Sequence, residues 1–111
     1  MTFAPDQPIA VFITAPNKEE ATRLADILVE RRLAACVQIL PAMESVYRWQ
    51  GKIERQTEVP LIAKTFTSKF AELEREVRAL HSYETPEIVA VPLTALSEPY
   101  RQWLNASVTS E

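Results

Sequence analysis

The chain has 111 residues, of which 47% are hydrophobic and 24% charged, and a formal net charge of −3 at pH 7. This composition is typical of one soluble globular domain. The negative charge argues against nucleic-acid binding, and a single glycine excludes glycine-rich loops that cradle phosphates. No apolar run approaches the length of a membrane span. Because the one cysteine cannot form an intrachain disulfide and no signal sequence is recognisable, we expect a cytoplasmic protein.

The N-terminal part predicts a leader, a strand and a helix. Residues 1–8 contain two prolines and show no periodicity, so we expect a flexible leader. The apolar run at residues 9–13 predicts a central strand that is covered on both faces. Asn17 is placed to cap a helix, and Glu20 is placed to reach back to it in a capping box. The apolar stripe of this helix consists of Ala21, Leu24, Ala25 and Leu28.

Residues 36–66 predict a long β-hairpin with Gly51 in its tight turn, where a positive φ costs glycine little. A two-residue turn places Pro41 opposite Pro60. Facing prolines cannot sustain ladder hydrogen bonds, so we expect a bend or bulge between an inner half and an outer arm. The inner half pairs residues 36–40 with 61–65, and the arm spans residues 42–59.

The outer arm holds more apolar and aromatic side chains than a solvated ribbon would carry. Tyr47 and Trp49 share one face of it with Met43. Because an isolated two-stranded ribbon is marginally stable in water, the arm needs a surface to pack on. A second copy of the chain is the simplest such surface. We therefore expect a homo-oligomer, with Tyr47 and Gly51 in the hairpin that contacts the neighbour.

The C-terminal half predicts a second helix, a last strand and a terminal helix. Thr67 or Ser68 is placed to cap the second helix, residues 87–93 read as the strand, and residues 97–99 as the start of the last helix. The stripe of the second helix is Phe70, Leu73, Val77 and Leu80. The order β-α-β-β-α-β plus a helix predicts an α+β, ferredoxin-like antiparallel sheet with both main helices on one face. Oligomerisation would then cover the other face.

His81 and Cys36 are the candidate metal ligands that the residues themselves suggest. His81 ends the second helix, and neutral imidazole is a common ligand for copper or zinc. The alternative role for His81 is a C-terminal cap that binds backbone groups of the helix end. Cys36 would suit Cu(I), although a free cysteine at the start of a strand is more often a small buried hydrophobe.

Aromatic residues with a polar tip are numerous and suit a partly wet cleft or interface. Subunit packing is a commoner reason for them than ligand stacking. Lys64 shares a strand face with apolar residues, so its charge would need a carboxylate partner such as Glu58 or Glu87. The aromatic set is Tyr47, Trp49, Tyr83, Tyr100 and Trp103.

Seven blocks carry a resemblance to a known family. They are residues 14–16, 33–37, 45–52, 58–59, 64–65, 81–87 and 100–104, and they include Leu-Ala-Ala-Cys-Val, Ser-Val-Tyr-Arg-Trp-Gln-Gly-Lys and His-Ser-Tyr-Glu-Thr-Pro-Glu. In order and spacing they resemble the CutA divalent-cation-tolerance family over residues 9–107, which leaves residues 108–111 as a tail. The resemblance implies a ferredoxin-like subunit in a tight homotrimer, similar to PII-type signalling proteins, with hairpins that embrace neighbouring subunits and clefts between chains.

The resemblance also implies site residues, with three departures. Ile13 stands where some members have a cysteine, Leu80 where some have a second histidine, and Ser82 where the family block has proline. A metal site is implied at His81, Cys36 and Glu84. An inter-subunit cleft or ligand site is implied at Trp49, Glu58, Lys64, Tyr83, Glu87 and Trp103. Without the missing ligands, a site of His81 with carboxylates or water would be weak and promiscuous.

These observations favour one function over several others. The leading hypothesis is a homotrimeric cytoplasmic protein of divalent-cation (copper) tolerance, which binds copper or another divalent cation weakly at inter-subunit clefts and requires no cofactor. The alternative is a PII-like small-molecule sensor or a trimeric scaffold without physiological metal binding. An enzyme is not expected, because no glycine-containing anion loop follows the first strand and no nucleophile accompanies the one imidazole. RNA binding is not expected either, because residues 59–66 lack the basic, glycine-rich aromatic motif.

Overall fold

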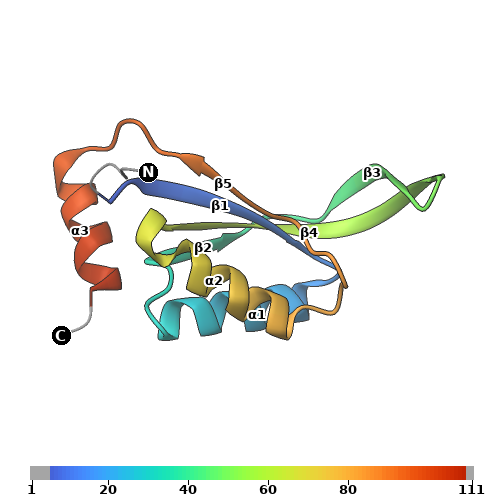
Figure 1. Ribbon diagram of the computed structural model, residues 1–111, viewed down its shortest axis with the longest axis horizontal. Coiled ribbons are helices and arrows are strands. Elements are labelled where there is room, and N and C mark those ends of the chain that lie inside the picture. The colour runs from blue at the N-terminus through green and yellow to red at the C-terminus, as the bar shows by residue number, and fades with distance from the viewer. Residues whose placement is uncertain (1–5, 110–111) are drawn as a thin grey trace.

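An antiparallel sheet, described with its helices over residues 6–109 in a computed structural model, forms the frame of the protein (Figure 1). In chain order the elements are β1 (Pro8–Ala15), α1 (Lys18–Glu30), β2 (Cys36–Ile39), β3 (Met43–Trp49), β4 (Lys52–Phe66), α2 (Thr67–Leu80), β5 (Ile88–Pro92) and α3 (Glu98–Val108). The strand order is β2-β4-β1-β5, and β3 pairs with the outer part of β4. This is the α+β, ferredoxin-like arrangement that the order of elements predicted.

The main core lies between the sheet and the two helices on one of its faces, α1 and α2 (Figure 1). Alternate residues of β1 point into it, because side chains along a strand alternate between the two faces. The predicted stripe of α1 is buried as a whole. In α2 the stripe stops one turn earlier than predicted, because Leu80 is 47% exposed. Core members from these elements include Ile9, Val11, Ile13, Leu24, Leu28, Leu73 and Val77.

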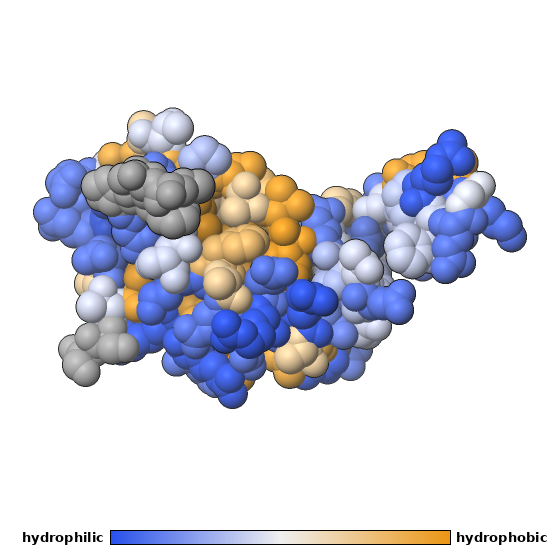
Figure 2. Space-filling view, viewed as in Figure 1, coloured by the Kyte–Doolittle hydropathy of each residue, from blue (hydrophilic) through white to orange (hydrophobic). Residues whose placement is uncertain are grey.

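The opposite face of the sheet is open in a single chain. Phe12, in the middle of β1, is 36% exposed, and Val89 and Val91 of β5 are exposed beside it. Figure 2 shows apolar residues gathered over the middle of the sheet. The prediction that β1 is covered on both faces is therefore wrong for one chain, because helices cover only one side. The open face remains a surface that a partner could cover.

The two main helices begin differently from each other. Asn17 caps α1 as predicted, with its side chain accepting the N–H of Glu20 at 2.8 Å. The Glu20 carboxylate, however, does not return to Asn17 and binds Ser82 instead. The predicted cap of α2 is also wrong: its N-cap is Phe66, which makes no side-chain hydrogen bond. A residue from before β1 supplies the acceptor, because Asp6 Oδ1 accepts the N–H of Ser68 at 2.9 Å.

The hairpin has the turn and the interruption that its sequence predicted. Gln50 and Gly51 both have positive φ, 49° and 80°, which matches the twist of a tight two-residue turn. The arm then pairs Trp49 with Lys52 and Met43 with Glu58. Between Met43 and Ile39, which pairs with Leu61, three residues face only two on β4. This one-residue bulge moves the inner half by one position, so that Cys36 pairs with Lys64 and not with Thr65.

The arm projects beyond the helices (Figure 1). The radius of gyration is 14.8 Å, compared with about 13 Å for a compact chain of this length. Large apolar side chains on both faces of the arm are exposed, among them Val46, Trp49 and Ile53. A projecting ribbon with such side chains is stabilised poorly by its own chain.

The third helix closes one end of the sheet. Ser97 caps it, and Leu104 and Val108 are buried against Ala35 and Phe66. The helix continues through Val108, the first residue of the predicted tail, while residues 110–111 lie outside the described part. Of the predicted leader, residues 1–5 also lie outside it, and Pro8 already belongs to β1. Among residues 6–109, no helix is long and apolar enough to cross a membrane.

Candidate functional site

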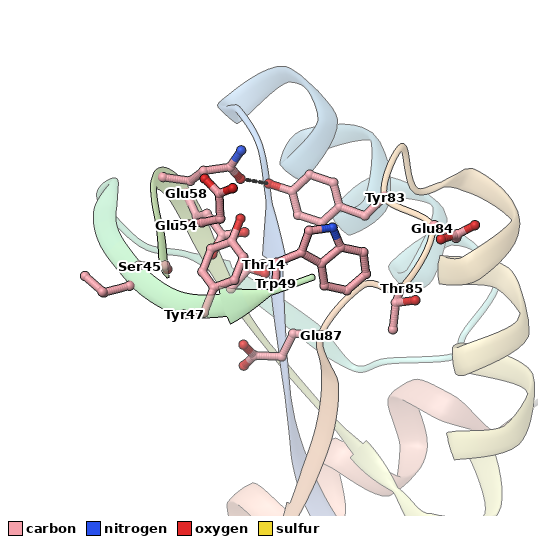
Figure 3. Close-up of a pocket in the computed structure, with 12 residues that line it drawn as sticks. Thr14, Ser45, Tyr47, Trp49, Glu54, Glu58, Tyr83, Glu84, Thr85 and Glu87 are labelled. Atoms are coloured by element: carbon pink, nitrogen blue, oxygen red, sulfur yellow. Dashed lines mark hydrogen bonds between the residues drawn. The ribbon is translucent and has the colours of Figure 1, made fainter. Parts of the chain in front are cut away.

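A groove of about 650 Å³ opens where the arm leaves the body of the molecule (Figure 3). Its walls come from β3 and β4 of the arm, from the end of β1, and from the loop between α2 and β5. The register of the arm explains one wall, because the pairs Tyr47–Glu54 and Met43–Glu58 place β4 glutamates on the face of the β3 aromatics. The lining residues are Thr14, Ser45, Val46, Tyr47, Trp49, Glu54, Gln56, Glu58, Tyr83, Glu84, Thr85 and Glu87.

The groove is acidic and aromatic. Four glutamates line it together with two tyrosines and a tryptophan, and none of its described lining residues is Lys, Arg or His. Glu58 is only 7% exposed, and no cationic side chain of the described residues pairs with it. A carboxylate in such a position keeps much of its negative potential, which makes the groove attractive to cations.

Two groups in the groove have shifted pKa values. Burial, together with the neighbouring Glu58 carboxylate, raises the pKa of the Tyr83 phenol to about 12. The phenol also donates a long hydrogen bond, 3.5 Å, to Gln56 Oε1. Burial, and then the charge of Glu58, raises the pKa of Glu87. Both shifts disfavour further negative charge, as expected in a groove without a counter-charge.

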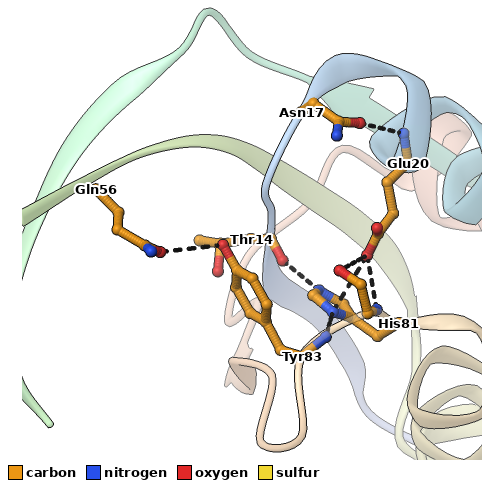
Figure 4. A network of polar contacts seen from close by, with 7 residues as sticks. Thr14, Asn17, Glu20, Gln56, His81 and Tyr83 are labelled. Carbon is orange, nitrogen blue, oxygen red and sulfur yellow. Dashed lines mark hydrogen bonds and ion pairs between the residues drawn. The ribbon is translucent and has the colours of Figure 1, made fainter.

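His81 lies behind the groove and not in it (Figure 4). It is the C-cap of α2, and its side chain is inaccessible to solvent. Its Nε2–H donates to the carbonyl oxygen of Thr14 at 2.6 Å, and its Nδ1 accepts the N–H of Tyr83 at 3.0 Å. Because both ring nitrogens are engaged within the chain, neither presents a free lone pair to a metal ion.

A second polar cluster lies at the other end of the sheet, beside α3. The Cys36 thiol is 3.9 Å from the Tyr100 hydroxyl, and Lys64 Nζ is 5.6 Å from the centre of the Tyr100 ring. Trp103 packs against Tyr100 with ring centres 5.4 Å apart and ring planes tilted by 41°. Lys64 and Glu58 are six residues apart on β4, about 20 Å along a strand. Within one chain Lys64 therefore does not pair with Glu58, and it faces an aromatic ring.

The structure divides the predicted site residues into these two groups. Of the cleft residues, the groove contains Trp49, Glu58, Tyr83 and Glu87, while Lys64 and Trp103 lie at the α3 end. The predicted metal ligands are not brought together within one chain: Glu84 lines the groove, His81 is buried behind it, and Cys36 is beside α3. Among residues 6–109, no three His, Cys, Asp or Glu side chains are grouped so that they could hold a metal ion.

The profile of the family described as CutA1 divalent ion tolerance protein matches residues 9–107, nearly the whole chain and both polar clusters. The chain belongs to this family. The CutA protein of Thermus thermophilus, a divalent-cation tolerance protein by name, is 48% identical over 94 residues, which are 85% of this chain and 91% of that protein. Chloroplastic CutA of Arabidopsis thaliana is 44% identical over 99 residues; the match covers 89% of this chain but only 54% of that protein.

A solved structure of CutA from Archaeoglobus fulgidus, described as a periplasmic divalent cation tolerance protein, has the same fold. Its TM-score is 0.89 at 44% identity, and the match covers 92% of this chain and 99% of the other. The fold and the CutA family membership predicted from the sequence are both confirmed. The family description supports a role in metal tolerance, and it names no enzyme class.

Sequence reasoning did not identify several groove residues of this CutA-family chain. Glu54 could have been found, because the predicted register already placed it opposite Tyr47. Thr14 and Thr85 lie outside the arm, so the register of the hairpin does not place them, although both lie in blocks that carry the family resemblance. Glu20 does not line the groove, but its role was also missed: it was expected in a capping box, and it binds Ser82, 62 residues away, a contact that no local pattern predicts.

Proposed function

We propose that this CutA-family protein acts in divalent-cation tolerance as a cytoplasmic homotrimer that binds cations weakly in the acidic groove, where subunits meet. The observation that carries the proposal is the set of groove glutamates without a cationic partner among the described residues, with Glu58 almost fully buried. The named relatives support the link to divalent cations. No cofactor is required, and no catalytic role is part of the proposal.

Oxygen ligands from Glu58, Glu84 and Glu87 are the donors that we propose in each chain. Carboxylates suit hard divalent cations and suit Cu(I) poorly, because that ion prefers thiolate and thioether ligands. A single chain lacks a converging group of three ligands over residues 6–109, so weak binding or completion by a neighbouring subunit is expected. His81 and Cys36 are left out, because the first is buried and fully bonded and the second lies at the other end of the sheet.

A homotrimer is supported by the surfaces that one chain leaves open. The helix-free face exposes Phe12, Val89 and Val91, and the arm exposes Val46 and Trp49. Apolar patches that are exposed in this way usually mark interfaces. The number three rests on the family resemblance. Sedimentation-velocity ultracentrifugation tests it directly, and a monomer at micromolar concentration would contradict it.

Cation binding is tested by calorimetric titration of Mn²⁺, Zn²⁺ and Cu²⁺ into the wild type and Glu58→Gln. Loss of the buried carboxylate is expected to weaken binding about tenfold, the effect of one charged contact of roughly 1.4 kcal/mol. Glu44→Gln is the matched control, because this glutamate is on the same arm but mostly exposed and 3.6 Å from Arg55. Equal affinities in all three proteins would reject the groove as the cation site.

A small-molecule sensor is the second candidate, and the aromatic lining favours it. A metal ion makes no use of Tyr47, Trp49 and Tyr83, whereas an organic cation can stack on such rings. A thermal-shift screen of metabolites should then find a stabiliser whose effect disappears in Trp49→Leu. A screen in which only metal ions stabilise the protein would reject the sensor and leave cation binding as the one remaining proposal.

The cytoplasmic location belongs to the same proposal. One relative is named chloroplastic and one solved structure is described as periplasmic, so the family occurs in more than one compartment. Cell fractionation of the native source, with immunodetection of this chain, is the direct measurement. Recovery in any fraction other than the cytoplasm would contradict the proposed location.

A further inference from the structure

The loop between α2 and β5, residues 81–87, supplies one wall of the acidic groove. Tyr83, Glu84, Thr85 and Glu87 all line the groove from it. Apart from the N–H of His81, which donates to the carbonyl oxygen of Val77 at 2.8 Å, backbone hydrogen bonds of a helix or strand do not hold this segment, because α2 ends at Leu80 and β5 begins at Ile88. The position of the wall therefore depends on side chains that bind the loop.

Glu20 of α1 binds the start of this loop without lining the groove (Figure 4). Its carboxylate is almost fully buried, and its Oε2 accepts the N–H of Ser82 at 3.0 Å and the hydroxyl of Ser82 at 3.1 Å. The same oxygen lies 3.3 Å from His81 Nδ1, which accepts the N–H of Tyr83 and so has no hydrogen to donate to the carboxylate. Burial of a carboxylate is costly unless its oxygens accept such bonds, so the contact is specific and not incidental.

His81 extends the attachment from the loop to the sheet. One ring nitrogen donates to the Thr14 carbonyl at the end of β1, and the other accepts the N–H of Tyr83. The rings of His81 and Tyr83 lie 4.7 Å apart. Tyr83 is thereby held at its backbone and beside its ring, while its hydroxyl reaches into the groove toward Gln56.

We infer that Glu20, His81 and Ser82 form a clamp that sets the position of Tyr83 and of the loop carboxylates in the groove, so that Glu20 controls cation affinity without touching the cation. The inference rests on the proposed function for its binding readout, but the position of the loop can be measured without any cation. Glu20 and His81 are positioning residues in this scheme, and neither is a ligand.

Ser82 supplies both of the loop groups that bind the Glu20 carboxylate. Proline, which the family block has at this position, carries neither an N–H nor a hydroxyl, so it could make neither of the two bonds to Glu20. Ser82→Ala removes one bond and Ser82→Pro removes both. The two variants therefore remove the contact in two steps, while Glu20 and His81 stay unchanged.

The experiment combines hydrogen exchange, tryptophan fluorescence and cation titration of the full chain. All variants are made in a Trp103→Phe background, so that Trp49, which lines the groove, is the only tryptophan. Glu20→Ala should speed amide exchange of Ser82 and Tyr83 about tenfold or more, shift Trp49 emission, and weaken Mn²⁺ binding about tenfold, the effects of a lost charged hydrogen bond. Glu20→Gln keeps an acceptor oxygen and should recover part of each effect. Ser82→Ala should fall between wild type and Ser82→Pro.

Glu19→Gln is the matched control, because Glu19 is exposed in the same turn of α1. It should change none of the three readouts. Unchanged exchange at Ser82 and Tyr83 in Glu20→Ala would overturn the clamp. If Glu20→Ala does not fold, unchanged exchange at both positions in Glu20→Gln and at Tyr83 in Ser82→Pro would overturn it, because proline has no amide hydrogen at position 82. Faster exchange with unchanged Mn²⁺ affinity would overturn its role in binding. If the wild type binds no cation, the proposed function fails, and exchange together with Trp49 emission still decides the clamp.

Discussion

The two ends of the sheet hold tyrosines in opposite electrostatic surroundings. Tyr83, at the groove, has its pKa raised by burial and further by the Glu58 carboxylate. Tyr100, beside α3, has its pKa raised by burial and by its contact with Cys36, but Lys64 acts in the other direction. The groove end has no counter-charge among its described lining residues, whereas the α3 end carries its own cation. The comparison supports the proposal that the groove takes a cation from outside the chain, and it shows that the α3 end has a cation of its own.

The α3 end should depend most on apolar packing. Leu104→Ala is expected to lower the free energy of unfolding by about 2–5 kcal/mol, because it empties a fully buried site against Phe66 and Ala35. Urea unfolding followed by circular dichroism measures the change. The neighbouring Trp103→Ala is the control, since this side chain is 46% exposed. A loss of stability as large as that of Leu104→Ala would show that the contact of Trp103 with Tyr100 stabilises the helix instead.

Alkaline pH should separate the two tyrosines. Because the folded pKa of Tyr83 is raised to about 12, above the ordinary value of about 10, the fold favours the neutral phenol. The resulting stability is fully present below about pH 10 and is lost as the pH rises toward 12. The urea midpoint of the wild type should therefore fall more between pH 9 and pH 11 than that of Tyr83→Phe. Tyr100→Phe should change this pH dependence of the urea midpoint less than Tyr83→Phe does, because Lys64 opposes the pKa shift of Tyr100. Equal pH dependences in the two variants would contradict the difference between the two ends of the sheet.

Removal of a groove charge should stabilise the folded chain. The pKa of Glu87 is raised, so the fold favours the protonated acid at low pH and loses that stability as the pH rises through the folded pKa. Glu87→Gln should accordingly unfold at higher urea than the wild type at pH 7, and the difference should vanish at pH 3. The gain should stay below about 1 kcal/mol, because Glu87 is partly screened by solvent. A loss of stability at pH 7 would show that Glu87 has a favourable partner.

The smallest effect is expected for the cation beside Tyr100. A cation over an aromatic ring at a partly exposed site contributes about 0.5 kcal/mol. A double-mutant cycle of Lys64→Met and Tyr100→Leu, measured by urea unfolding, should return a coupling of that size. Zero coupling would mean that the 5.6 Å approach of Lys64 to the Tyr100 ring adds no stability. The electrostatic difference between the α3 end and the groove would then have no effect on stability.

Elements with local patterns were predictable, and contacts between distant segments were not. The stripe of α1, the cap at Asn17 and the turn at Gly51 each follow from residues a few positions apart, and the structure confirms them. The bulge was also predictable, because two facing prolines leave the ladder without donors. The spacing of apolar residues, together with the residue types at caps and turns, thus accounts for most of the fold.

The candidate site was only half predictable for the same reason. Four of the six expected cleft residues meet at the groove, since the arm and the 81–87 block each carried a recognisable signal. The cap of α2 by Asp6 and the bond from Glu20 to Ser82 join residues 62 positions apart. These two contacts depend on tertiary packing, which periodicity does not encode. The distance of Lys64 from the groove was predictable, because the hairpin already placed it in the inner half, six residues along the strand from Glu58 in the arm.

The bulge between the inner half of the hairpin and the arm also determines where the arm points. Three residues, 40–42, lie opposite two on β4, so deletion of Pro41 would equalise the count and leave one uninterrupted ladder. The turn at Gly51 would still set the pairing of β3, and Tyr47 and Trp49 would keep their face. The direction of the ribbon would change, and with it the surface that it reaches and the spacing between the arm and the body residues of the groove. The length of one short segment therefore sets both the reach of the arm and the width of the groove.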